Sequence, residues 1–114
     1  MDEKIMHLLV FSNPVAGSED EYNDWYDNQH LSDVVAVEGV RSAQRYESVG
    51  TPGGEPSPHG YLAIYECEGD ITEILAEMGV RREDGRMPVT EGFDTSTAVS
   101  SIWAPRGPQV VDPS

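Results

Sequence analysis

Four segments of the chain have the hydrophobic pattern of β-strands. Residues 5–11 form a short, nearly continuous apolar run bounded by polar residues. Residues 40–49, 61–67 and 95–104 alternate in character and contain many β-branched and aromatic side chains, as is typical of strands. These segments place apolar or aromatic residues on both faces, so we expect both faces of the sheet to be covered.

A first helix is predicted between the first two strands. Ser18 and Glu21 have the S-x-x-E spacing of a capping box, which indicates a helix start. A break is expected near Leu31, and Gly39 ends the helical segment. At 3.6 residues per turn, one side of this helix carries Tyr22, Trp25, Tyr26, Gln29 and His30.

A second helix is predicted after the third strand. Asp70 and Glu73 have a spacing like that of a capping box, and the helix ends at Gly79 or continues through residues 80–83. The pattern i, i+3, i+4, i+7 is followed by Ile71, Ile74, Leu75 and Met78. Residues 50–60, which are rich in glycine and proline, and residues 84–94 are predicted as loops.

The order strand–helix–strand–strand–helix–strand predicts an α+β fold of the ferredoxin-like βαββαβ type, with a four-stranded antiparallel sheet carrying both helices on one face. With 114 residues there is room for one domain, which we assign to residues 1–104, followed by a C-terminal arm at 105–114. An uncovered apolar sheet face is rare in monomers. We therefore expect a homodimer in which two sheets pack face to face as a dimeric α+β barrel.

Charge and composition narrow the choice of partners. The 21 Asp and Glu residues against seven Lys and Arg residues give a net charge of −14, which repels nucleic-acid phosphates and anionic membrane surfaces. We therefore expect neither nucleic acid nor membrane as a partner. The single cysteine and the lack of a signal-like or membrane-spanning apolar run predict a cytoplasmic protein.

Two stretches of the sequence resemble a known family. Trp25, Tyr26 and His30 form a W-Y-x-x-x-H pattern, and residues 37–46 continue it as V-x-G-V-x-x-A-x-R-Y. Together with residues 61–69, this segment is similar to the dimeric α+β-barrel superfamily, particularly its EthD-like branch. The resemblance covers the first helix and the second and third strands, and beyond them only the order of elements agrees.

The resemblance implies a fold more directly than a reaction. Members of the superfamily include cofactor-independent cyclases, isomerases, dehydrochlorinases and monooxygenases that act on aromatic or polyketide-like compounds, and others are known only as proteins of degradation gene clusters. Ser32 stands where such sequences commonly have proline, which weakens the expected helix break. The family histidine corresponds by position to His30.

His30 is the first candidate for catalysis, because imidazole exchanges protons near neutral pH. Asp33, three residues later, would orient its ring if the helix continues. The alternative is a structural histidine bonded to a backbone carbonyl. Trp25 and Tyr26 are candidates to bind a flat substrate, although an aromatic stripe at helical spacing is more often core, an interpretation that we favour for Trp25.

His7 is the second candidate, because it lies in the middle of an apolar strand. If its face of the strand points into the barrel, His7 lies there with Tyr46, Tyr61 and Tyr65. One imidazole would then remove a carbon-bound proton while a phenol, Tyr46 in particular, donates to the enolate. Tyr61 and Tyr65 would contact the substrate. The alternative is a satisfied interior histidine.

Other kinds of site have little support in the sequence. The three histidines lie on separate elements without metal-ligand spacing, so no metal is expected. No glycine-rich phosphate loop precedes a helix, and no cofactor is expected. Cys67 lies at a strand end without a defined base, and G-x-S-x-G is absent.

Three hypotheses for the function follow. The first is a cofactor-independent lyase, isomerase or cyclase that moves a proton of a small apolar, aromatic or enolisable, polyketide-like compound through His30. The second is a cofactor-free monooxygenase of the same fold, which would consume oxygen. The third is a non-catalytic ligand-binding accessory protein of a degradation pathway.

Overall fold

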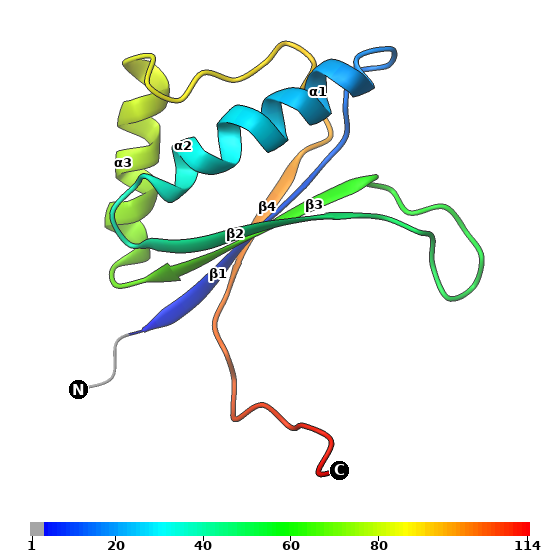
Figure 1. Ribbon diagram of the computed structural model, residues 1–114, viewed down its shortest axis with the longest axis vertical. Helices are drawn as coiled ribbons and strands as arrows, with labels where there is room; N and C mark the ends of the chain where they lie inside the picture. Colours follow the sequence, from blue (N-terminus) through cyan, green and yellow to red (C-terminus); the bar gives the residue numbers. More distant parts are fainter. Residues whose placement is uncertain (1–3) are drawn as a thin grey trace.

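The computed structural model describes residues 4–114, whose elements follow the predicted order (Figure 1). The strands pair in the order β2-β3-β1-β4, and each neighbouring pair is antiparallel. The ferredoxin-like βαββαβ fold is therefore confirmed. The elements are β1 Ile5–Ser12, α1 Glu19–Trp25, the π-helix η1 Tyr26–His30, α2 Leu31–Val35, β2 Val40–Glu47, β3 Tyr61–Glu68, α3 Ile71–Glu83 and β4 Val99–Trp103.

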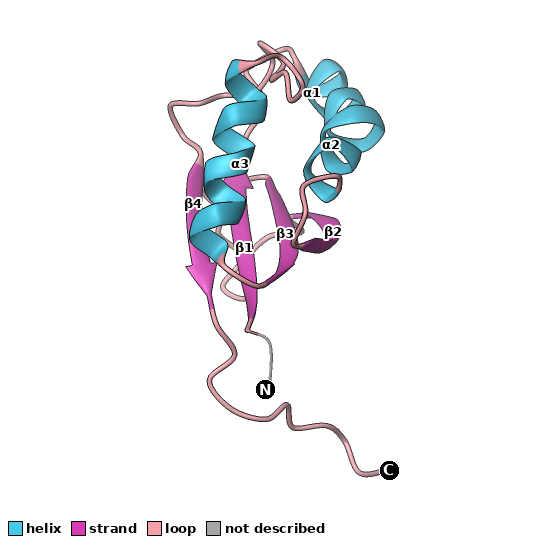
Figure 2. Cartoon of the chain, turned by 90° about the vertical axis from the view of Figure 1, so that its left-hand side faces the viewer, coloured by secondary structure: helices cyan, strands magenta, loops and turns pink. Residues whose placement is uncertain are grey.

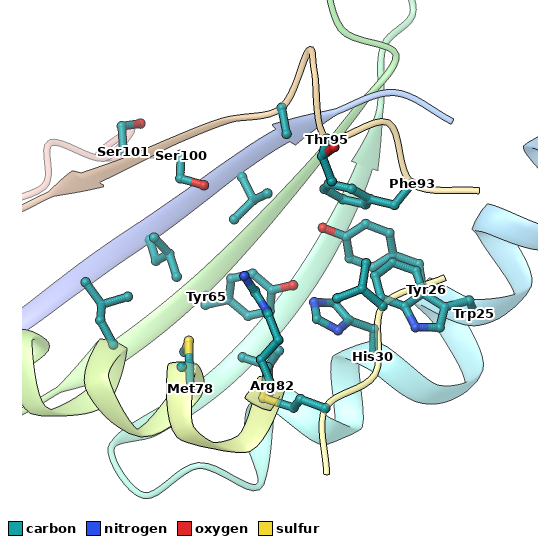
Figure 3. A pocket seen from close by; sticks show the side chains of 18 of the residues that line it. Trp25, Tyr26, His30, Tyr65, Met78, Arg82, Phe93, Thr95, Ser100 and Ser101 are labelled. Atoms are coloured by element: carbon teal, nitrogen blue, oxygen red, sulfur yellow. The ribbon is translucent and has the colours of Figure 1, made fainter. Parts of the chain in front are cut away.

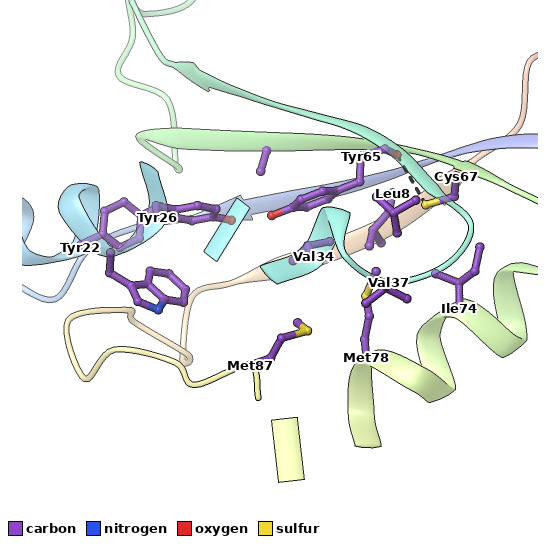
Figure 4. Close-up of a cluster of buried hydrophobic side chains, with 13 residues drawn as sticks. Leu8, Tyr22, Tyr26, Val34, Val37, Tyr65, Cys67, Ile74, Met78 and Met87 are labelled. Carbon is purple, nitrogen blue, oxygen red and sulfur yellow. Dashed lines mark hydrogen bonds between the residues drawn. The ribbon is translucent and has the colours of Figure 1, made fainter. Parts of the chain in front are cut away.

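All helices lie on one face of the sheet (Figure 2). On β1 and β3, Leu8 pairs with Tyr65 and Val10 with Ala63, which places these side chains on the same face. The hydrophobic core lies between this face and the helices (Figure 4). Its buried members include Tyr22, Tyr26, Val34, Val37, Cys67, Ile74, Met78 and Met87.

No helix of residues 4–114 lies over the other face of the sheet (Figure 2). We call it the open face. The strand registers assign to it Ile5, His7, Leu9, Phe11, Ser42, Gln44, Tyr46, Leu62, Ile64, Glu66, Val99, Ser101 and Trp103. Tyr46, Val99 and Trp103 are 48%, 50% and 58% exposed, which is high for large apolar side chains. The expectation of two largely apolar faces is thus met, and the chain itself covers only one of them with helices.

The predicted capping box at the start of α1 is wrong. Ser18 is the N-cap residue but makes no side-chain capping hydrogen bond. The Glu21 carboxylate instead accepts hydrogen bonds from the Thr90 hydroxyl and, at 3.2 Å, from the Gly92 amide. Glu21 therefore fastens the segment between α3 and β4 to α1 rather than closing the helix end.

The helical segment does not break near Leu31. Residues 26–30 instead form a π-helical turn, and α2 follows without interruption. The wider turn changes the faces that an α-helical spacing predicts: His30 is buried, whereas Gln29 is exposed. Single π-helical turns of this kind are frequent at functional sites.

A bulge in β2 corrects another predicted face. Val40 pairs with Cys67 and Ser42 pairs with Glu66, so Arg41 is an extra residue in the strand. Val40 therefore points into the core, whereas Tyr46 lies on the open face. The simple alternation had placed Val40 and Tyr46 on the same face.

The start of α3 follows the prediction. Asp70 accepts hydrogen bonds from the Thr72 and Glu73 amides at 2.9 and 3.4 Å. The helix continues past Gly79 to Glu83. The following loop reaches residue 98, so β4 is shorter than predicted. Residues 104–114 are exposed and extend away from the sheet without a helix or strand (Figure 1).

In residues 4–114 no helix has both the length and the apolar character needed to cross a membrane.

Candidate functional site

A cavity of about 830 Å³ lies between the helix-covered face of the sheet and the helices (Figure 3). Strands β1, β3 and β4 form its floor. One wall consists of α1, η1 and α2, and the other consists of α3 and the loop at residues 84–98. Its lining is mainly apolar and aromatic and includes Leu8, Val10, Trp25, Tyr26, Val34, Met78, Met87 and Phe93. A volume and lining of this kind suit a small organic molecule.

The cavity opens between α3 and β4. Tyr26, His30 and Tyr65 are buried on its inner side. The exposed lining residues lie on α3, the loop at 84–98 and β4: they are Leu75, Gly79, Arg82, Val89, Thr95, Ser100 and Ile102. A ligand entering from that side would meet the buried aromatic wall last.

His30 lies deep in this cavity. Its imidazole stacks on the Trp25 indole, with ring centroids 4.4 Å apart and an interplanar angle of 22°. Tyr26 contacts it edge-on at 5.2 Å. Burial, and secondly the positive charge of Arg82, lower the pKa of His30 from 6.5 to about 4. The imidazole is therefore neutral at neutral pH and can accept a proton.

The Nδ1 atom of His30 is buried and has no hydrogen-bond partner within residues 4–114. Asp33 does not orient the ring as expected, because its own Oδ2 atom is also without a partner in this part of the chain. The structural interpretation requires a bond from a His30 ring nitrogen to a backbone carbonyl, and among the described residues Nδ1 makes no such bond. A buried unpaired ring nitrogen needs a bound partner or a functional explanation.

Tyr65 provides a second unpaired polar group in the same cavity. Its hydroxyl is buried and has no hydrogen bond of normal geometry to the described residues, although the Tyr26 hydroxyl points toward it (Figure 4). Burial and the neighbouring Tyr26 raise the pKa of Tyr65 far above its ordinary value of 10.0. The phenol therefore keeps its proton and can donate a hydrogen bond to a ligand oxygen.

Trp25 belongs to both the core and the cavity wall. It is buried, lines the cavity and donates a hydrogen bond of 3.0 Å from Nε1 to the Pro88 carbonyl. This bond fixes the indole on which His30 stacks and also holds the loop at residues 84–98. The favoured interpretation of Trp25 as plain core is therefore incomplete.

The predicted grouping of His7 with Tyr61 and Tyr65 in one cavity is wrong. His7 pairs across strands with Glu66 and Trp103 on the open face, whereas Tyr61 and Tyr65 lie on the helix-covered face. The cause is the alternation of side chains along paired strands. His7 and His30 consequently lie on opposite sides of the sheet.

Tyr46 and Tyr61 do not line the cavity. Tyr46 lies on the open face with His7, whereas His30, the third predicted catalytic residue, lies on the helix-covered side of the sheet. The Tyr61 hydroxyl donates to Glu19 at 2.9 Å and accepts from Asn23 at 3.2 Å. Tyr61 is thus engaged in binding α1 to the sheet.

Sequence reasoning missed two arginines near the site. The Arg45 guanidinium lies 4.3 Å from the centroid of the Tyr26 ring, and it bonds to Asp27 and Asn23 at 2.8 Å each. It thereby fixes the aromatic wall by a cation–π contact. Arg82 lines the cavity itself. Its sequence signal was the lack of an acidic residue three or four positions away on its helix.

Within residues 4–114, no three His, Cys, Asp or Glu side chains are grouped so that they could hold a metal ion. The polar groups that line the cavity are instead the His30 imidazole, the Arg82 guanidinium, the phenols of Tyr26 and Tyr65, and the hydroxyls of Thr95, Ser100 and Ser101. These groups suit hydrogen bonding and proton transfer.

Comparisons with solved structures identify the fold. A proposed monooxygenase from Shewanella loihica PV-4 matches with a TM-score of 0.60 and 12% identity over 98% of this chain and 99% of that chain. An ethyl tert-butyl ether d (EthD) family protein from Bacillus halodurans C-125 matches with a TM-score of 0.54 and 15% identity over 94% and 99%. Rv0793 from Mycobacterium tuberculosis matches with a TM-score of 0.52 and 17% identity over 96% and 99%.

No protein-family model matches the sequence, and a comparison with curated proteins finds no match. Identities of 12–17% establish a shared fold and not a shared activity. The resemblance that Trp25, Tyr26 and His30 carry is therefore confirmed at the level of the fold: the chain has the ferredoxin-like α+β fold of an EthD family protein.

Proposed function

We propose that the protein is a cofactor-independent enzyme of the lyase, isomerase or cyclase type, which acts on a small aromatic or enolisable, polyketide-like compound by proton transfer at His30. The observation that carries the proposal is the neutral His30 imidazole, buried with an unpaired Nδ1 atom inside an aromatic cavity. A structural histidine in such surroundings would have its ring nitrogens bonded.

In this proposal each cavity residue has a defined task. Trp25 and Tyr26 provide flat apolar surfaces that position an aromatic ring. The unpaired nitrogen of His30 accepts a proton from a carbon next to a carbonyl or phenol. The Tyr65 hydroxyl donates a hydrogen bond to the oxygen on which negative charge develops. His30 then returns the proton to a different carbon in an isomerisation. In an elimination the bond to the leaving group breaks and that group takes the proton, and in a ring closure the carbanion attacks a carbonyl carbon of the same molecule and the resulting alkoxide takes the proton.

A cofactor-free monooxygenase is the second candidate. The same first step produces an electron-rich anion, which would react directly with O₂, leaving one oxygen atom in the product and the other in water. The specific observation in its favour is the Shewanella loihica neighbour, a proposed monooxygenase whose whole chain shares this fold. The third hypothesis, a binding protein without catalysis, predicts ligand binding and no proton transfer.

Solvent deuterium exchange tests the proposed step without knowledge of the natural substrate. 2-Tetralone, a flat aromatic ketone with acidic carbon-bound protons, is incubated with protein in D₂O and followed by NMR. We expect the wild type to accelerate exchange, His30→Gln to abolish the acceleration, and His59→Gln to retain it. His59 is the matched control because it lies in the 50–60 loop, where its ring bonds to the Thr97 carbonyl.

The outcomes separate the candidates. Equal acceleration by His30→Gln and wild type would remove His30 from the mechanism. An oxygen electrode in the same mixtures distinguishes a monooxygenase, which consumes O₂, from an isomerase-type enzyme, which does not. Saturable binding without exchange or oxygen uptake would favour the accessory-protein hypothesis.

We also infer that two copies pair through the open face. Apolar and aromatic side chains from all four strands lie on it, and no helix covers them (Figure 2). An apolar face of this kind is normally buried against a partner. In a twofold dimer the open face of each copy covers the open face of the other. This pairing would place His7 and Tyr46 at the interface, away from His30.

A further inference from the structure

Arg82 lines the cavity and forms no ion pair with another side chain of residues 4–114. Within residues 4–114, acidic partners form ion pairs with Arg41, Arg45, Arg81 and Arg86. Arg82 and Arg106 form none with this part of the chain, although acidic residues outnumber basic ones 21 to 7. Arg106 lies in the exposed segment after β4, away from the cavity. The neighbours of Arg82 at positions −4 and −3 are Met78 and Gly79 on α3, and those at +3 and +4 are Gly85 and Arg86 just beyond the end of the helix. None of these four residues offers a carboxylate.

The cavity does not provide a counter-charge either. Among residues 4–114, no Asp or Glu lines it, and Arg82 is the only fully charged side chain that does. In Figure 3 the Arg82 side chain extends from α3 into the cavity on the side of His30 and Tyr65. The residue is exposed at the mouth, so an incoming ligand would meet it before the buried groups.

The surroundings favour an anion. A guanidinium beside apolar walls binds a carboxylate or a similar oxygen anion through paired, charge-assisted hydrogen bonds. The Tyr65 hydroxyl, unpaired among the described residues, is a further donor in the same cavity. The Arg82 cation and the Tyr65 donor, with no Asp or Glu among the described lining residues, create a site for negative charge in a protein whose net charge is −14.

From this arrangement we propose that Arg82 is the specificity-determining residue of the cavity and that the ligand is a flat, mostly apolar molecule with one anionic oxygen group. The inference rests on the proposed function, because it takes the same cavity as the ligand site. It adds a chemical class, an aromatic carboxylate or a comparably acidic phenol or enol, and the residue that selects it.

The bound anion would also act on His30. Within residues 4–114, the aromatic and charged groups next to this imidazole are Trp25, Tyr26, Tyr65 and Arg82, and only Arg82 carries a charge. Because the Arg82 charge helps to lower the pKa of His30, an anion paired with Arg82 would raise that pKa again. Ligand binding would thereby make His30 a stronger base at the moment when it is needed.

Calorimetric titration with two probes of nearly equal shape tests the proposal. 2-Naphthoate is anionic at pH 7, and 2-naphthamide is neutral. We expect wild type to bind the naphthoate at least about tenfold more tightly, in line with a charge-assisted hydrogen bond in a partly solvated site. Arg82→Gln should remove this preference, and Arg82→Lys should keep part of it.

Arg81→Gln is the matched control, because Arg81 directly precedes Arg82 on the same helix and pairs with Glu77 instead of lining the cavity. It should retain the preference of the wild type. Equal affinity of the wild type for the two probes, or a preference that survives in Arg82→Gln, would overturn the assignment of Arg82 while leaving the cavity as a ligand site. If neither probe binds, this inference fails, whereas the proposed function is decided by the deuterium exchange of 2-tetralone. If the wild type prefers the anionic probe but does not accelerate deuterium exchange, only the proposed function is contradicted.

Discussion

The burial of His30 predicts a specific dependence of stability on pH. Unfolding exposes the imidazole and returns its pKa from about 4 to the ordinary 6.5. Between these values the unfolded state binds a proton that the folded state does not, so stability falls as pH decreases through this window. The full difference corresponds to about 3 kcal/mol, of which about 2 kcal/mol is expressed between pH 7 and pH 5.

Urea unfolding of the wild type and of His30→Gln at pH 7 and pH 5 isolates this contribution. Carboxylates also titrate in this range, but their contribution is common to both proteins and cancels in the comparison. We expect the wild type to lose about 2 kcal/mol more than His30→Gln on acidification. An NMR titration of the imidazole provides the direct value of its pKa. A His30 that titrates near 6.5, with equal pH dependence in the two proteins, would refute the reasoning.

Three further predictions follow from particular contacts. Tyr65→Phe removes a buried, unpaired hydroxyl, so unfolding free energy should stay equal or rise by about 1 kcal/mol while deuterium exchange falls; a clear loss of stability would contradict this. Gly39→Ala should lower the free energy of unfolding in urea by about 2–3 kcal/mol, because φ is +101° and the new Cβ would lie 2.6 Å from the Ile74 Cδ1 atom. Gly50→Ala is the control for backbone strain alone, because its φ is +110° and its new Cβ would have no atom within 4 Å. Ile64→Glu on the open face should convert a dimer into a monomer in sedimentation at micromolar concentration, and a wild type of monomeric mass would disprove the pairing.

The fold was predictable because the local patterns agree with one another. The apolar run at residues 5–11, the Asp70 cap and the order of elements all indicate the same sheet with helices on one face. The faces were less predictable, because a single extra residue at Arg41 reverses the orientation of Val40 relative to the rest of β2. A bulge of this kind leaves no clear signal in an alternating sequence.

The candidate site was predictable only in part. His30, Trp25 and Tyr26 come from one helical segment, and local spacing placed them together correctly. Tyr65 and Arg82 join them from elements distant in the sequence, so their convergence depends on strand register and on how α3 packs. Glu21 illustrates the same limit, because its spacing from Ser18 predicts a helix cap and its actual partners lie about 70 residues away.

The most direct test of the central claim is the location of a bound ligand. Titration of isotope-labelled protein with 2-naphthoate, followed by NMR, reports which side of the sheet responds. We predict saturable chemical-shift changes at His30, Tyr65 and Met87, which border the cavity, and small changes at His7 and Ile64 on the open face. Changes confined to the open face, or no saturable change at any of these residues, would contradict the assignment of the cavity as the functional site.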